Sequence, residues 1–199
     1  MSSRPGVFLL LGSALFAAGC DRERQAPAQA NSAAPDEMTA GPDEAVAPAA
    51  APKPGVFDRS YEGEAAPDIA FTAPDGRQAR LADFRGKPLL VNLWATWCAP
   101  CVAEMPTLDA AAATLGDRVR VLAVSQDLDG AAKVRPFLAS RGVKNLQPYL
   151  DPEVGLSTGY GVNLPATILY DARGREVWRR LGAYEWSSPE AMRAIAEAY

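Results

Sequence analysis

Large apolar side chains are distributed unevenly along this chain. A compact apolar run occupies residues 7–18, whereas residues 21–58 contain almost no large apolar side chain. Apolar stretches with regular spacing return only after residue 59 and continue to the C-terminus. A segment without such side chains cannot bury enough surface to offset its ordering entropy. We therefore expect one folded domain over 59–199, preceded by a disordered tether over 21–58.

Within residues 59–199, the pattern predicts strands that alternate with helices. Turn residues at 73–76 and 171–175 separate pairs of short apolar stretches and predict two β-hairpins. The expected elements, in chain order, are strands 69–72 and 77–81, a loop 81–88, a buried strand 89–94, a helix from residue 98, a strand 119–125, a helix 131–141, strands 166–170 and 176–180, and a helix 189–199. Such alternation implies right-handed crossovers and a partly parallel sheet, so the predicted fold class is α/β.

The first twenty residues have the pattern of an export signal. Arg4 supplies a positive charge ahead of the apolar run, which is too short to cross a bilayer as a stable helix. Small residues at 17–19 precede Cys20, which resembles a bacterial lipobox and predicts lipidation of Cys20. The alternative is an ordinary signal peptide cut near residue 18 or 19. That cut would leave Cys20 as an unpaired thiol in an oxidising compartment, where it invites mispairing.

The net charge of the chain is −4, and the tether accounts for it. Residues 21–58 hold seven acidic and three basic side chains, while residues 59–199 are close to neutral. A near-neutral domain does not indicate nucleic-acid binding or a strongly charged partner. A flexible tether that contains proline lets the domain reach partners some tens of ångströms from a membrane.

Two cysteines, Cys98 and Cys101, stand where the predicted helix begins. The first helical turn carries N–H groups without intrahelical partners, and these groups and the helix dipole favour a thiolate at Cys98. Pro100 suits an early helical position because it lacks an N–H that would be unpaired there. Cys101 lies one turn later, close enough to attack a mixed disulfide formed on Cys98. The pair therefore predicts thiol–disulfide exchange.

A zinc site and a structural disulfide are the other interpretations of such a pair. Zinc normally takes four ligands, but the chain has no histidine, and its remaining cysteine, Cys20, lies far upstream. A structural disulfide usually closes a longer loop, because the stabilisation grows with the loop closed. The strand before the pair and the helix after it favour redox chemistry.

Residues 91–106, VNLWATWCAPCVAEMP, resemble the active-site segment of the TlpA/ResA-like thioredoxin family. Residues 160–167, YGVNLPAT, resemble the proline loop of the same family, and the likeness runs from about residue 66 to the C-terminus. The resemblance implies a thioredoxin-like fold: a mixed central sheet flanked by helices, with an N-terminal β-hairpin and a central insertion. It also implies a membrane-tethered disulfide reductase that acts outside the bacterial cytoplasm.

The resemblance assigns further roles around the pair. Glu104 resembles an acid that this family places near the pair, and we expect it to exchange protons, because Asn92 stands where thioredoxin has a buried aspartate. Pro165 is expected to follow a cis peptide and to leave the Leu164 backbone free to pair with a client strand. Structural alternatives are a solvated Glu104 at the helix start and a trans Pro165 at a strand edge. Trp97 and Pro100 are expected to contact the client as well.

The predicted function is a thiol–disulfide oxidoreductase that reduces disulfides in exported proteins, without a metal or other cofactor. The uncharged Ala99 and Pro100 do not stabilise the reduced state further, which favours the reducing direction. By resemblance, the clients are apocytochrome c or a copper-site assembly protein, and the electron donor is a transmembrane thiol protein. Asp21 resembles a signal for retention at the inner membrane, which predicts a lipid-anchored protein on its periplasmic side.

Three other functions use the same cysteines. A disulfide oxidase or isomerase would share every residue named above. A copper(I)-binding assembly module would use the two thiolates as soft ligands. A peroxidase of the peroxiredoxin type normally has Thr or Ser three residues before its cysteine, where this chain has Ala95.

Overall fold

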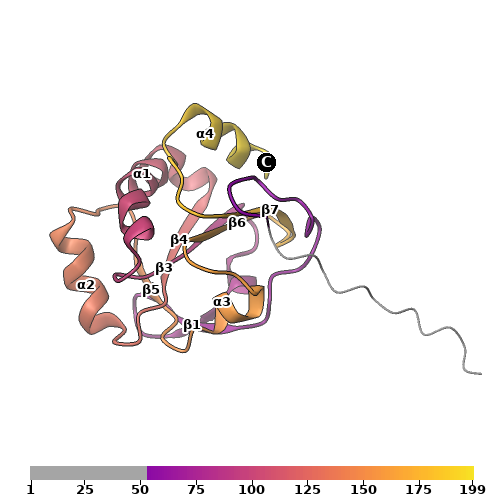
Figure 1. Cartoon of the computed structure of the whole chain (residues 1–199). Coiled ribbons are helices and arrows are strands. Elements are labelled where there is room, and N and C mark those ends of the chain that lie inside the picture. The colour runs from indigo at the N-terminus through magenta and orange to yellow at the C-terminus, as the bar shows by residue number, and fades with distance from the viewer. Residues whose placement is uncertain (1–52) are drawn as a thin grey trace, which may run out of the picture. The chain divides into compact units, whose positions relative to one another are not determined.

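The computed structural model describes residues 53–199, which form a seven-stranded mixed sheet with helices on both faces (Figure 1). The strand order is β2-β1-β5-β4-β3-β6-β7. The strands are β1 Ala70–Thr72, β2 Gln78–Arg80, β3 Leu89–Trp94, β4 Arg120–Ser125, β5 Pro148–Leu150, β6 Ala166–Tyr170 and β7 Glu176–Leu181. The helices are α1 Ala99–Leu115, α2 Ala131–Ser140, α3 Gly155–Tyr160 and α4 Pro189–Ala196, with short 3-10 turns at Leu81–Phe84 and Gly116–Arg118. The predicted α/β thioredoxin-like fold is confirmed.

Strand β3 lies inside the sheet, and five of its six residues are apolar. All six of its residues are buried, as expected for a strand covered by helices on each side. It pairs in parallel with β4 and antiparallel with β6. Its end brings the chain to the redox pair, so a fully buried strand supports the candidate site.

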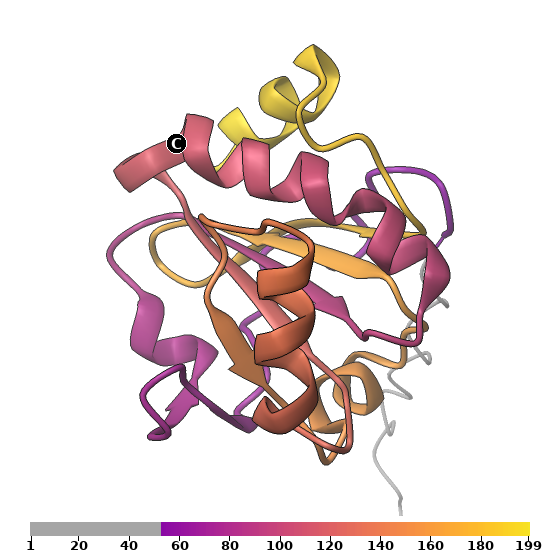
Figure 2. The ribbon, with the colours of Figure 1, turned by 90° about the vertical axis from the view of Figure 1, so that its left-hand side faces the viewer.

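Alternate side chains of β3 enter two separate hydrophobic cores. Leu90 and Trp94 pack in the core under α1, α2 and α4, whereas Leu89, Val91 and Leu93 pack in the core that includes α3. Figure 2 shows α1 lying across the sheet, with α2 on the same side. The redox pair belongs to the first of these cores.

Both predicted hairpins are present, at β1–β2 and β6–β7. The predicted central insertion corresponds to α2 and β5, which follow β4. Helix α1 continues through Pro106 to Leu115 without interruption. Strand β5 and helix α3 are absent from the elements that the local pattern predicted. Both are short, three and six residues, and β5 is held by its pairing with β4 and β1 rather than by a strong local pattern.

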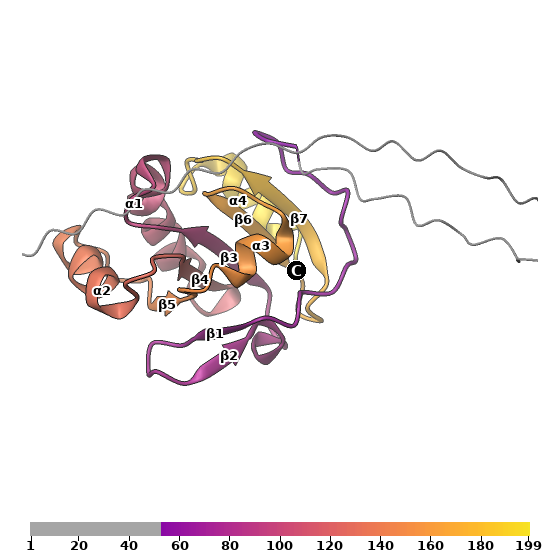
Figure 3. The ribbon, with the colours of Figure 1, turned by 60° about the horizontal axis from the view of Figure 1, so that its bottom comes forward.

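The predicted boundary of the tether at Asp58 is wrong, because residues 53–58 lie against the edge strand β7. The Gly55 N–H donates to the Leu181 carbonyl, and Asp58 exchanges backbone hydrogen bonds with Arg179. The Phe57 ring meets Trp178 edge-on with ring centroids 4.7 Å apart. Figure 3 shows this segment passing along β7 before the chain reaches β1. These few residues become ordered because β7 offers them unpaired backbone groups.

The predicted signal segment 1–20, the lipidation residue Cys20 and the tether up to residue 52 lie outside the described residues. Over residues 53–199, none of the helices has both the length and the apolar character needed to span a bilayer.

Candidate active site

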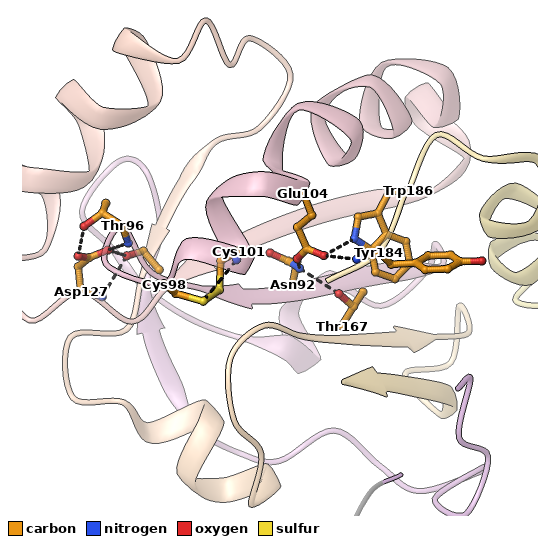
Figure 4. The surroundings of a disulfide bond; sticks show 10 residues. Asn92, Thr96, Cys98, Cys101, Glu104, Asp127, Thr167, Tyr184 and Trp186 are labelled. Carbon is orange, nitrogen blue, oxygen red and sulfur yellow. Dashed lines mark hydrogen bonds between the residues drawn. A yellow bond between two sulfur atoms is a disulfide. The ribbon is translucent and has the colours of Figure 1, made fainter. Parts of the chain in front are cut away.

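Cys98 and Cys101 form a disulfide at the start of α1 (Figure 4). The Cα atoms of the two cysteines are 5.3 Å apart, within the ordinary range for a disulfide. The structure therefore presents the oxidised form of the predicted redox pair.

The local backbone places Cys98 at the N-terminal end of α1. Cys98 is the N-cap residue, its backbone is extended, and its Sγ accepts a hydrogen bond from the Cys101 N–H at 3.4 Å. Pro100 lies in the first turn, as predicted, and costs no helical hydrogen bond there. Once the disulfide is reduced, the same N–H and the helix dipole favour a thiolate on Cys98.

The two cysteines differ in their exposure. Cys98 is 6% exposed and borders a cavity of about 700 Å³, whereas Cys101 is fully buried. None of the cavity-lining residues is charged: Trp97, Cys98, Ala99, Pro100, Gln126, Val154, Ser157, Thr158, Gly161, Val162, Asn163 and Leu164. An incoming disulfide can thus approach Cys98 from this groove, while Cys101 is reached only from within the protein.

The predicted client-contacting residues meet at this groove. Trp97, 65% exposed, and Pro100 line it on the α1 side, and Leu164 lines it on the side of the proline loop. The Leu164–Pro165 peptide bond is cis, as the resemblance implied, so the alternative of a trans proline is excluded. Trp94, by contrast, is completely buried in the core.

Glu104 is buried, 4% exposed, and points away from the groove toward the loop before α4. Its carboxylate accepts hydrogen bonds from Asn92 Nδ2, the Tyr184 N–H and Trp186 Nε1, at 2.9 to 3.0 Å. Burial raises the pKa of Glu104, and the three donors only partly offset this effect. The alternative of a solvated residue at the helix start is therefore wrong.

Asn92, which lies on β3, links Glu104 on α1 to Thr167 on β6. Its Nδ2 also donates to Thr167 Oγ1 on β6, at 2.9 Å, while its Oδ1 is buried without a hydrogen-bond partner. Because Glu104 lies one helical turn after Cys101, the Asn92 amide sits beneath the first turns of α1 (Figure 4). The amide occupies this place without being able to accept a proton from Cys101.

One residue near the pair was missed by the sequence analysis. Asp127, at the end of β4, accepts hydrogen bonds from both the backbone N–H and the hydroxyl of Thr96, two residues before Cys98. A signal for it exists in the sequence, because Asp127 closely follows an apolar strand that neighbours β3 in parallel. The carboxyl ends of parallel neighbouring strands meet at the same edge of a sheet.

Comparisons with known proteins agree with this geometry. Residues 61–195 match the model of the Redoxin family. The chain is 31% identical over 122 residues to the thiol-disulfide oxidoreductase ResA of Bacillus thuringiensis (strain Al Hakam), which covers 60% of this chain and 69% of the relative.

Two solved structures are similar as well. A Chlorobium tepidum protein described as a thiol:disulfide interchange protein of the DsbE type has a TM-score of 0.60 at 26% identity, covering 69% of this chain and 96% of that protein. The exposed lipoprotein thioredoxin of Streptococcus pneumoniae has a TM-score of 0.55 at 28% identity, covering 66% and 99%. The chain thus belongs to the Redoxin family, as a thioredoxin-like thiol–disulfide oxidoreductase with Cys98 and Cys101 as its cysteine pair.

Proposed function

We propose that this protein reduces disulfides in exported proteins, with Cys98 as the nucleophile and Cys101 as the resolving cysteine. The observation that carries the proposal is the asymmetry of the pair: Cys98 borders an uncharged groove, and Cys101 is fully buried. Only Cys98 is placed to meet a protein disulfide. Cys101 is placed to attack the sulfur of Cys98 afterwards.

The reaction transfers two electrons in two exchange steps. The Cys98 thiolate attacks one sulfur of the client disulfide, forms a mixed disulfide, and displaces the other client sulfur as a thiolate that takes up a proton. Cys101 then loses its proton and attacks Cys98 Sγ. The Cys98–Cys101 disulfide forms, the second client thiol is released, and the client has gained two electrons and two protons.

Glu104 is our candidate for accepting the Cys101 proton. Its pKa is raised by burial, which brings its proton affinity closer to that needed near neutral pH. The Asn92 amide, hydrogen-bonded to Glu104, lies on the side of Cys101 in Figure 4 and is a suitable link between them. Glu104 also holds the loop before α4 through Tyr184 and Trp186, so it combines a chemical and a structural role.

The reducing direction is supported by what surrounds Cys98. The groove contains no basic side chain that would stabilise a thiolate on Cys98. Stabilisation of the reduced form makes such a protein an oxidant, so a groove without basic side chains favours a reductant. We expect a potential near thioredoxin's value of about −270 mV rather than DsbA's value of about −120 mV.

We also propose that the domain is anchored by lipid on Cys20 to the periplasmic side of the inner membrane. The lipobox-like residues before Cys20 support this, and a structural relative is itself named a lipoprotein. A transmembrane thiol protein would then supply electrons, and apocytochrome c or a copper-site assembly protein would receive them.

Mass spectrometry of the membrane fraction tests the anchor: an unmodified, fully soluble protein with free Cys20 would refute it.

Trapping of the mixed disulfide tests the reaction. The C101S variant of the full chain, expressed in the native cell envelope, should accumulate covalent complexes with client proteins that dissociate in dithiothreitol. The matched C98S variant should accumulate none, because it lacks the nucleophile. Complexes formed equally by C98S would contradict the assigned roles.

The equilibrium redox potential of the Cys98–Cys101 pair decides whether the protein acts as a reductase or as an oxidase. The wild-type protein is titrated against glutathione and dithiothreitol buffers, with trapping of free thiols at each point. A value near about −270 mV supports the reductase, and a value near about −120 mV would instead identify a disulfide oxidase.

A further inference from the structure

The turn that carries Cys98 is held by a buried carboxylate from another strand. Asp127 Oδ2 accepts the Thr96 N–H at 2.8 Å, and Asp127 Oδ1 accepts the Thr96 hydroxyl at 2.5 Å. The Asp127 side chain is almost completely buried, and it also accepts the Ser125 hydroxyl at 2.8 Å. Both oxygens of one carboxylate are thus used on the active-site side of the sheet.

The fold explains why these groups meet. Strands β3 and β4 run in parallel with Trp94 opposite Ser125, and the Gln126 N–H continues the ladder to the Trp94 carbonyl at 2.8 Å. The next residues of both strands therefore leave the sheet side by side. Asp127 faces Thr96 there, as Figure 4 shows.

The turn from Thr96 to Cys98 has few other fixed contacts. A backbone hydrogen bond joins the Cys98 N–H to the Ala95 carbonyl at 3.1 Å. The Trp97 side chain between them is largely exposed. Besides the packing and the disulfide of Cys98 itself, the Thr96 hydrogen bonds are the side-chain contacts that join this turn to the chain after β4.

The surroundings of Asp127 make the carboxylate rigid. Lys133 on α2 lies 3.9 Å from Asp127 Oδ1, and the Asp127 N–H itself donates to Ser125 Oγ at 3.1 Å. Lys133 is also 3.8 Å from Asp129. A carboxylate held by contacts with β4 and α2 can fix the turn that it binds, since hydrogen bonds to charged groups are about twice as strong as neutral ones.

We propose that Asp127 is a positioning residue for disulfide exchange, which acts through Thr96 to hold the Cys98 sulfur in line with the incoming disulfide and with Cys101. Exchange needs three sulfurs in a row, first with the client and then with Cys101. Misplacement of a reacting atom by about 1 Å can cost on the order of a hundredfold in rate. Attack by the Cys98 thiolate on a small alkylating reagent does not require three sulfurs to be aligned.

Two reactions of Cys98 therefore distinguish a loss of positioning from a general loss of stability. The reaction of reduced protein with oxidised glutathione, followed at pH values where its rate has reached a plateau, reports alignment of the sulfurs. The alkylation of Cys98 by iodoacetamide, also on its plateau, reports an accessible thiolate, because the small reagent approaches freely from the groove. Neither reaction depends on the physiological client, so the test is independent of the proposed reductase function.

We expect T96V and D127N each to slow the plateau reaction with oxidised glutathione by about tenfold, within the range expected for misplaced reacting groups. Alkylation on its plateau should stay within about twofold of wild type. T96S keeps the hydroxyl and should restore the glutathione reaction. The double variant should be no slower than either single variant, because the two side chains act through one contact.

Asp58 supplies a matched control. It is also a buried carboxylate that accepts a backbone N–H and a hydroxyl, both from Ser60, but it lies beside β7, across β3 and β6 from Asp127. D58N should lower stability and leave the glutathione reaction unchanged. Folded T96V and D127N proteins that react with oxidised glutathione at the wild-type plateau rate, or losses that simply multiply in the double variant, would overturn the proposal.

Discussion

At the scale of single residues, the redox pair depends on buried polar groups that the motif does not contain. Glu104 illustrates the point, because its carboxylate lies in the core yet binds three donors from β3 and the loop before α4. Burial disfavours the charged form more than these donors favour it, and the pKa of Glu104 is raised. A raised pKa in a folded protein has a direct consequence for stability.

We predict that E104Q removes part of the pH dependence of stability. The folded state holds the Glu104 proton to higher pH than the unfolded state, whose pKa is near 4.5. The contribution of Glu104 is therefore most favourable below pH 4.5 and is lost as the pH rises through the raised folded pKa. Urea unfolding between pH 4 and pH 8 should show wild type losing stability relative to E104Q as the pH rises.

Comparison of the two proteins isolates Glu104 from the other buried acid with a raised pKa, Glu176, which titrates in both. The glutamine can still accept from Tyr184 and Trp186, and the unpaired Asn92 Oδ1 can accept from its amide after the Asn92 side chain turns over. Parallel stability curves for the two proteins would show that the Glu104 pKa is not raised.

At the scale of elements, helix α3 forms one wall of the groove and is shaped by tertiary contacts. Asp151 at the end of β5 accepts the N–H groups of Gly155 and Leu156, which would otherwise lack partners at the start of α3. Val154, just before the helix, lines the groove and has a left-handed backbone with φ of 58°. A β-branched residue is strained in that conformation.

We predict that V154G stabilises the protein by about 1 kcal/mol, because the strain of a left-handed β-branched residue exceeds the entropic cost of glycine. Val162 lines the same groove without a left-handed backbone, so V162G serves as the control and should destabilise. Urea denaturation of both variants provides the measurement. Destabilisation by V154G to the same extent as by V162G would mean that the strain at Val154 is negligible.

At the scale of the whole molecule, the folded unit includes residues that compositional reasoning assigned to the tether. Phe57 contacts Trp178 and Tyr184, with ring centroids 4.7 and 5.5 Å apart. Asp58 pairs with β7 through backbone hydrogen bonds, and the pKa of its carboxyl is lowered to about 2 by hydrogen bonds from Ser60 and Lys53. The edge of the sheet is thereby covered.

We predict that a chain beginning at residue 53 is more stable than one beginning at residue 59 by about 2 kcal/mol or more, the value expected from burying one aromatic side chain and pairing a strand edge. Urea denaturation of the two chains measures the difference. F57A in the longer chain should account for a large part of it. Equal stabilities of the two chains would place the boundary at 59, as the composition suggested.

The elements whose signals are local could be predicted from the amino-acid pattern. The apolar run of β3, the turn residues of the two hairpins, and the cysteine spacing at the start of α1 each predicted what the structure contains. Periodicity and turn chemistry act within a few residues of the chain, so they can be read without knowledge of the fold. The motif for the redox pair is local in the same sense.

The elements and contacts that depend on segments far apart in the chain became visible only in the folded protein. β5 and α3 are too short to give a pattern of their own, and they exist because β4 pairs with β5 and Asp151 caps α3. The link between Asp127 and Thr96 spans 31 residues, and the ordering of residues 53–58 depends on β7. Such features arise when hydrogen-bonding groups become adjacent on folding, and a sequence pattern does not record that adjacency.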